Sequence, residues 1–168
     1  YDLNFNKGIK DSEKIFSVTA GDMDGSGKRQ MNFCRPLADI IIDCSPNIEY
    51  GGALSFTTGY NRYWIEEDGV RKNVDIVGVS KFNGNALKVF GFDAVEGSLD
   101  DITDYNTLAV SETIAKRFGL EVGMTLGYDE QKDIITIKAI FKDMPKNSHL
   151  RDISALRNMG DESANNFS

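Results

Sequence analysis

The chain has 168 residues, of which 40% are hydrophobic and 27% charged, and its formal net charge is -7 at pH 7. This composition is typical of a globular domain and excludes collagen-like and intrinsically disordered classes. An acidic chain without a basic stripe repels phosphate backbones, which argues against a nucleic-acid partner.

Neither end of the sequence carries a targeting pattern. Tyr1 is not followed by the basic segment and apolar core that a signal peptide requires. No run of about 18 apolar residues occurs, so the sequence predicts no membrane-spanning helix. We expect both ends to be cuts within a longer protein. A processed protein whose leader has been removed is the alternative.

The first predicted elements form a β-hairpin. Residues 14–20 are rich in β-branched and aromatic types and alternate in character, which indicates a strand. Residues 21–27 are dense in glycine and aspartate and predict a turn, and residues 28–33 predict the returning strand.

A helix is predicted from Pro36 to Cys44. Proline suits a first helical position, and apolar residues recur at the spacing of one helical face. We expect Leu37, Ile40 and Ile41 to be buried against the sheet that residues 14–20 begin. Cys34 and Cys44 would lie about 15 Å apart along such a helix, too far for a disulfide, so we interpret both as small buried side chains.

The middle of the chain predicts a long hairpin and a short helix. Residues 52–65 read as a polar and aromatic strand region, Asp68-Gly69 is a two-residue hairpin signal, and residues 70–80 predict the partner strand. Residues 85–90 predict a helical turn that ends at Gly91. Its apolar face would consist of Ala86, Leu87, Val89 and Phe90.

A second unit follows the acidic, polar linker of residues 97–104. A strand over residues 107–110 leads to Ser111, a good N-cap for a helix from Glu112 to Phe118. Gly119 stands at the expected end of this helix. Glu112 in the first turn and two basic residues in the last turn complement the helix dipole.

Two further strands are predicted at residues 124–128 and 134–141. In the second strand, one face would carry Ile135, Ile137, Ala139 and Phe141, and the other face would carry Thr136 and Lys138. Together with the short helices, these strands predict an α+β fold.

The acidic turn of residues 22–27 resembles the start of a calcium loop. Such a loop needs a bidentate acid at position twelve, where this chain has Phe33, and it lies between predicted strands rather than helices. A surface hairpin loop is the better interpretation. Lys28 does not belong to a phosphate loop, because Asp22 and Arg29 stand where glycine and a hydroxyl residue are required.

His149 is the single histidine and follows Ser148 directly. No G-x-S-x-G elbow and no zinc-ligand spacing accompany it, which favours a loop residue in a structural turn over a catalytic or metal-binding one. We therefore predict no enzyme activity, no catalytic residue, no metal site and no cofactor.

Tyr60, Tyr63 and Trp64 form an aromatic cluster that looks exposed. On a strand, Tyr60 and Trp64 share one face and Tyr63 takes the other. Two interpretations stay open: a patch that contacts a partner or ligand, and aromatic side chains packed on the sheet.

Five segments carry a family resemblance that spans most of the chain in order. They are residues 1–18, 36–49, 90–97, 110–119 and 143–150. Together they resemble the extracytoplasmic core domain of MacB/FtsX-type ABC transporter permeases. The last two segments are the most specific, and their motif residues are Ser111, Glu112, Phe118, Gly119, Pro145, Asn147, Ser148 and His149.

The resemblance implies an α+β fold of two lobes, a porter-like lobe of βαβ type and a smaller, mixed sabre-like lobe. Residues 1–97 would form the first part of the porter-like lobe, and residues 98–168 the sabre-like lobe and a C-terminal tail. The family returns to the porter lobe through a further strand-helix-strand, which leaves open whether that lobe is complete in this chain.

The resemblance also implies a non-catalytic periplasmic domain of a bacterial inner-membrane permease. Such a domain transmits ATP-driven conformational change across the membrane to move or release a substrate or to activate a partner. The implied partners are a cytoplasmic ATPase subunit, a second permease copy and a periplasmic adaptor or lipoprotein.

Two other classes of function compete with this one. An extracytoplasmic ligand-sensing domain of a membrane receptor would need a concave pocket with convergent polar groups. A secreted hydrolase would need a catalytic constellation, which the sequence lacks.

Overall fold

The computed structural model describes residues 9, 11–16, 43–55, 59–128 and 133–159. The strands of this part belong to one sheet. They are β1 (Gly52–Leu54), β2 (Gly59–Glu67), β3 (Val70–Gly84), β4 (Ala94–Gly97), β5 (Thr107–Ser111), β6 (Thr125–Tyr128), β7 (Asp133–Phe141) and β8 (Ala155–Asn158). The helical elements are η1 (Ser12–Lys14), α2 (Ala86–Val89), η2 (Leu99–Asp101) and α3 (Glu112–Phe118). This mixture of strands and short helices confirms the α+β class.

The strand pairings of the sheet return to their starting point. From β3 the order runs through β2, β6, β7, β5 and β8, and β8 pairs with β3 again. The β3–β8 and β5–β7 pairs are parallel, and the other pairs are antiparallel. Strands from both sides of residue 97 therefore lie in the same sheet. The division into lobes at that residue stays a prediction.

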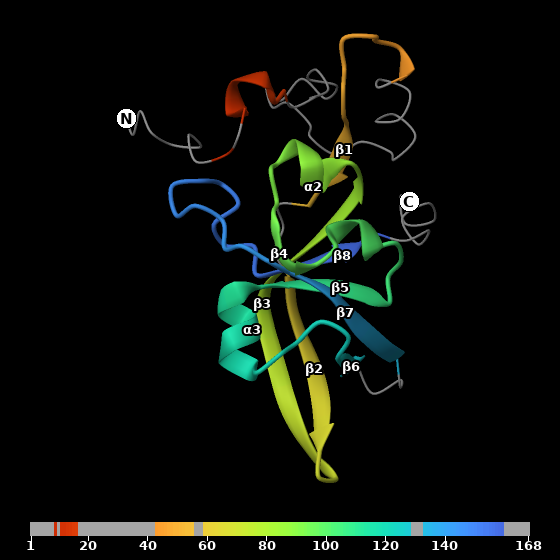
Figure 1. The fold of residues 1–168 in the computed structure, drawn as a ribbon, viewed down its shortest axis with the longest axis vertical. Helices are drawn as coiled ribbons and strands as arrows, with labels where there is room; N and C mark the ends of the chain where they lie inside the picture. Colours follow the sequence, from red (N-terminus) through yellow and green to blue (C-terminus); the bar gives the residue numbers. More distant parts are fainter. Residues whose placement is uncertain (1–8, 10, 17–42, 56–58, 129–132, 160–168) are drawn as a thin grey trace, which may run out of the picture.

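The longest element is the β2–β3 hairpin, which projects as an arm at the bottom of Figure 1. Its turn has positive φ at Asp68 (φ 52°) and Gly69 (φ 75°), the geometry that two-residue hairpins of this type require. The hairpin signal is thus confirmed. Gly78 (φ 91°) lies where β3 leaves the arm, and a Cβ there would approach the carbonyl oxygen of Asp152 to 2.1 Å.

Two hydrophobic clusters cover opposite faces of the central strands. One includes Leu108 and Val110 of β5 and is covered by α3, whose Ile114 and Ala115 are buried in it. The other includes Ala109 of β5 and is covered by α2 through Ala86 and Leu87. All residues of β5 are buried, because this strand contributes side chains to both clusters.

The prediction that four residues of β7 share one face is wrong, although all four are buried. Ile135 and Ile137 belong to the cluster under α3, and Ala139 and Phe141 belong to the other cluster. The pairing of β7 with β5 skips Lys138, and a one-residue bulge exchanges the two faces of a strand.

Other local predictions are confirmed closely. The helix α3 has Ser111 as N-cap and ends at Gly119, which has a left-handed backbone with φ 66°. The short helix α2 is followed by Gly91, also at φ 66°. The strands β4 and β8 were not predicted: both are only four residues long, and β4 has no buried residue.

Two predictions for the N-terminal part of the chain are wrong, and others lie outside the described residues. Lys14 does not begin a strand but closes the 3-10 turn η1, and Phe16 is 86% exposed. Cys44 is exposed and not in a disulfide, so its predicted burial is wrong. Residues 17–42, with Cys34, the acidic turn and most of the predicted helix, lie outside the described residues.

Candidate functional site

The outer face of the β2–β3 arm carries two of the three predicted aromatic residues. Tyr60 and Trp64 lie on the same face, opposite Val77 and Asn73 of β3. Tyr60 is 54% exposed and Val77 is 67% exposed. We call this surface the hairpin face; its residues are Tyr60, Arg62, Trp64, Arg71, Asn73, Asp75 and Val77.

Tyr60 is held in place by a polar network on the hairpin face. Its hydroxyl donates to Asp75 Oδ1 at 2.8 Å, and Arg62 Nε donates to the same oxygen at 2.8 Å. The Arg62 hydrogen bond, with that of Tyr60, lowers the pKa of Asp75, and the bond to Asp75 raises the pKa of Arg62. Asp75 and Arg62 stay ionised at neutral pH, so this exposed phenol ring is oriented before any partner arrives.

Trp64 lies flat between two neighbours. The guanidinium of Arg71 is 4.1 Å from the centroid of its ring. On the next strand Gly127 is the residue paired with Trp64, and a Cβ at that position would lie 2.0 Å from a ring atom. Glycine is therefore needed there to admit the indole, a contact that the sequence did not reveal.

Tyr63 does not belong to the exposed cluster, because its side chain is fully buried in the core under α3. Its ring packs against Tyr128 with centroids 5.3 Å apart. Burial raises the pKa of Tyr63 to about 12, although the nearby charge of Arg157 opposes this effect. Tyr63 thus supports the arm from inside, and only Tyr60 and Trp64 remain candidates for partner contact.

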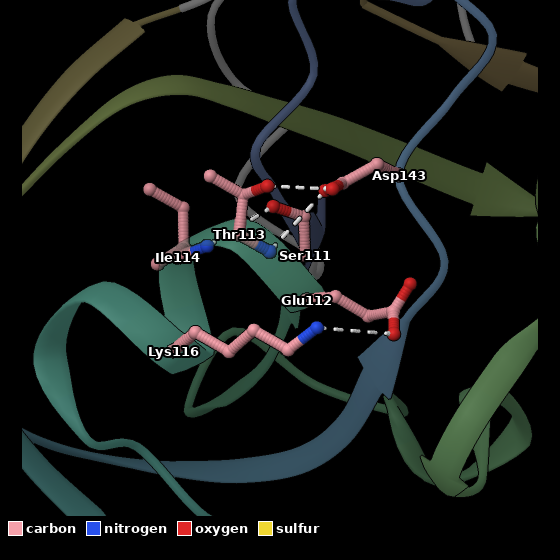
Figure 2. Close-up of polar contacts among 6 residues, drawn as sticks. All are labelled: Ser111, Glu112, Thr113, Ile114, Lys116 and Asp143. Atoms are coloured by element: carbon pink, nitrogen blue, oxygen red, sulfur yellow. Dashed lines mark hydrogen bonds and ion pairs between the residues drawn. The ribbon is translucent and has the colours of Figure 1, made fainter.

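A second polar site joins α3 to the segment that follows β7 (Figure 2). Ser111 Oγ accepts from the backbone N–H of Ile114 at 3.4 Å, which is the N-cap that the sequence predicts. Asp143, in the segment after β7, accepts two hydrogen bonds from Thr113. Its Oδ2 accepts from Thr113 Oγ1 at 2.6 Å, and its Oδ1 accepts from the Thr113 N–H at 3.4 Å. We call this cluster the α3 junction; its residues are Ser111, Thr113 and Asp143.

Electrostatics favour the charged form of Asp143. Partial burial alone would raise the pKa of its carboxyl group, but hydrogen bonds from Thr113 and Ser111 outweigh it and lower the pKa. An ionised carboxylate near the first turn also suits the helix dipole. Glu112 and Lys116, one turn apart on the same helix, form an exposed ion pair at 3.9 Å (Figure 2).

The loop of residues 143–150 is folded around Ser148. This side chain is fully buried, and its hydroxyl donates to the carbonyl oxygen of Pro145 at 2.8 Å and accepts from the N–H of Leu150 at 3.2 Å. Leu150 is buried in the cluster under α2. His149 is exposed. The loop therefore ties the α3 junction at one end to the second core at the other.

An open groove of about 550 Å³ is lined in part by Leu87 and Lys88 of α2. Figure 1 shows α2 at the opposite end of the molecule's core from the arm. The floor of the groove is apolar and includes Phe82, Leu87 and Phe92, and its rim carries the ion pair of Lys88 with Asp100 at 3.6 Å. Such a volume lies within the range of small-molecule sites.

Within the described ranges, no group of three or more His, Cys, Asp or Glu residues could hold a metal ion. In the part of the chain that the structure describes, no helix is long and apolar enough to cross a membrane.

Comparison with known proteins gives matches among solved structures only. No family model matches the sequence, and no curated protein matches it. A domain of a protein assigned as a permease, from Porphyromonas gingivalis, is 25% identical, with a TM-score of 0.59 over 91% of this chain and 64% of that one. The chain thus spans slightly less than two thirds of that structure.

A second solved structure has lower sequence identity but a similar extent. The periplasmic region of MacB from Actinobacillus actinomycetemcomitans is 13% identical, with a TM-score of 0.53 over 93% of this chain and 69% of that one. The chain therefore has the α+β fold of a MacB-like extracytoplasmic permease domain.

Proposed function

We propose that this chain is the non-catalytic periplasmic domain of an ABC transporter permease in a bacterial inner membrane. Its role is to transmit ATP-driven conformational change across the membrane, and so to move or release a substrate or to activate a partner. The observation that carries the proposal is the match to a permease domain over 91% of the chain.

The described structure suits a part that transmits force. The strand pairings from β3 through β2, β6, β7, β5 and β8 close on themselves, so each of these strands is held on both sides over part of its length. Closed pairing resists shear better than an open edge, because backbone hydrogen bonds must break before the strands can separate.

The α3 junction and its loop link the two hydrophobic clusters. Asp143 bonds to Thr113 at the start of α3, and Leu150 at the other end of the loop is buried beneath α2. A displacement applied to α3 would therefore be passed to the opposite face of the sheet through a short, hydrogen-bonded segment.

The partners under this proposal are a cytoplasmic ATPase subunit, a second copy of the permease and a periplasmic adaptor or lipoprotein. The hairpin face offers a contact surface for one of them. Tyr60 and Trp64 are the aromatic types that contribute most to protein interfaces, and both are held in fixed orientations by Asp75 and Arg71.

The test uses the full-length permease with its ATPase in one reconstituted membrane system. Exchanging Thr113 for valine and Asp143 for alanine should reduce transport severalfold, because the contact that passes force to the loop is lost. ATP hydrolysis should continue, because the ATPase subunit is unchanged. The matched control is Lys88→Ala, which removes an exposed ion pair far from the junction. Normal transport by a folded junction variant would refute the role of this segment.

The groove of about 550 Å³ favours one rival, a ligand-sensing domain of a membrane receptor. The flanking sequence discriminates between the two. Four transmembrane helices, with this domain after the first, are expected for a permease, whereas a kinase or methyl-accepting module would indicate a receptor.

A further inference from the structure

Arg157 is a buried cation that forms no ion pair with any carboxylate of the described residues. Its side chain lies in β8 and the residue is only 7% exposed. Its Nη2 donates to the carbonyl oxygen of Tyr105 at 2.7 Å, but its Nε is buried and has no hydrogen-bond partner among the residues that the structure describes. A buried charge with no counter-ion is unfavourable, so this position favours an anion.

The guanidinium is held in a fixed orientation by its aromatic surroundings. Its Cζ lies 4.8 Å from the centroid of the Tyr128 ring. The buried hydroxyl of Tyr63 lies close enough to Arg157 for the charge of the guanidinium to lower its pKa, against the larger effect of burial. A planar cation that is already oriented loses little freedom when it binds a planar anion.

Lys81 lies directly beside Arg157. The parallel pairing of β3 with β8 matches these two residues, so two cations occupy neighbouring positions on one face of the sheet. Like charges directly opposite each other on paired strands are destabilising. An anion between the two would remove this repulsion.

A small cavity opens at this pair of cations. Its volume is about 140 Å³, and it is lined by Lys81, Tyr105, Tyr128, Asp133, Arg157, Asn158 and Met159. This volume is below the usual range for complete small-molecule ligands. The cavity can hold one polar group of a ligand, and Asp133 on its lining disfavours a group that carries two negative charges.

We propose that this cavity binds a single carboxylate group between Arg157 and Lys81, from a small carboxylic acid or from an acidic side chain of a polypeptide. A carboxylate carries one charge and is planar, so it matches the fork of the guanidinium. The proposal stands on the described residues of the cavity and is independent of the transporter function.

The experiment follows the Nε–H signal of Arg157 by NMR in the isotope-labelled chain. Sodium acetate is added to about 100 mM at constant ionic strength, well above the millimolar dissociation constant expected for so small a ligand. A saturable shift that chloride does not produce is expected. A short peptide with one glutamate and blocked ends distinguishes the sources: tighter binding than acetate assigns the site to a polypeptide side chain, and equal binding assigns it to a free acid.

Two surface variants avoid disturbing the buried residues. Lys81→Gln should weaken acetate binding about threefold, the size expected for an exposed ion pair, and Asp133→Asn should tighten it about twofold because a repulsive charge is removed. Lys88→Gln makes the same charge change outside the cavity and should alter nothing. A shift that never saturates, equal effects of Lys81→Gln and Lys88→Gln, or tighter binding of phosphate than of acetate would each overturn the proposal.

Discussion

Replacing Asp143 by asparagine removes the charge at the α3 junction while leaving an oxygen that can still accept from Thr113. The bond between Thr113 Oγ1 and Asp143 Oδ2 is 2.6 Å long, whereas the contact from the Thr113 N–H is 3.4 Å and contributes little. One bond to a charged group stabilises a buried site by about 1.5–3 kcal/mol. Since Asp143 is exposed, competition from water reduces this to about 1 kcal/mol.

We therefore expect Asp143→Asn to lower the free energy of unfolding by about 1 kcal/mol, which for a chain of this size corresponds to about 2–4 °C in Tm. Urea denaturation at pH 7 measures this for the single variants Asp143→Asn and Thr113→Val and for the double variant. The double variant should lose less than the sum of the two single losses, because Asp143→Asn weakens and Thr113→Val removes the same bond. Strict additivity would show that the two side chains do not interact and would refute the junction.

The dependence of this loss on pH gives an independent check. The pKa of Asp143 in the folded protein lies below its ordinary value of 3.8. A lowered carboxyl pKa stabilises the folded state above the unfolded pKa, and this contribution disappears as pH falls through the folded pKa. The difference in stability between wild type and Asp143→Asn should thus be constant near neutral pH and shrink below about pH 4. A difference in stability that stays constant down to about pH 2 would contradict the lowered pKa of Asp143.

Three further outcomes are expected. Gly127→Ala should displace the indole of Trp64, the single tryptophan, and change its fluorescence, whereas Gly59→Ala should not, since a Cβ at Gly59 meets only one atom, at 3.9 Å. Ser148→Ala should lower the free energy of unfolding by about 1–3 kcal/mol, because it leaves buried backbone groups without their partner. Asn147→Ala, at a half-buried position, should lower it by about 1 kcal/mol. Urea denaturation of both variants measures the two losses. Elemental analysis of chelator-washed protein should find no stoichiometric zinc or calcium, and a full equivalent of either would disprove the predicted absence of a metal site.

Some residues of the candidate sites could be predicted from the sequence, and others could not. Ser111 and Gly119 were predicted correctly because a helix cap depends on a few adjacent residues. Trp64 and Tyr63 were assigned to the correct opposite faces, but alternation alone could not decide which face is covered, and the structure buries Tyr63. Asp143 was not recognised as a partner of Thr113, because thirty residues separate the two in the chain.

The sequence by itself determined the elements whose causes are local: the Asp68-Gly69 turn, the capped helix α3 and the long strands β3 and β7. Only the tertiary structure decided the strand pairing. It placed β4 and β8 in the sheet, exchanged the faces of β7 at Lys138 and brought Lys81 beside Arg157. The physical reason is that turns and caps are stabilised by hydrogen bonds within a few residues, whereas register depends on which distant surfaces bury each other, and the shift of one residue reverses every side chain beyond it.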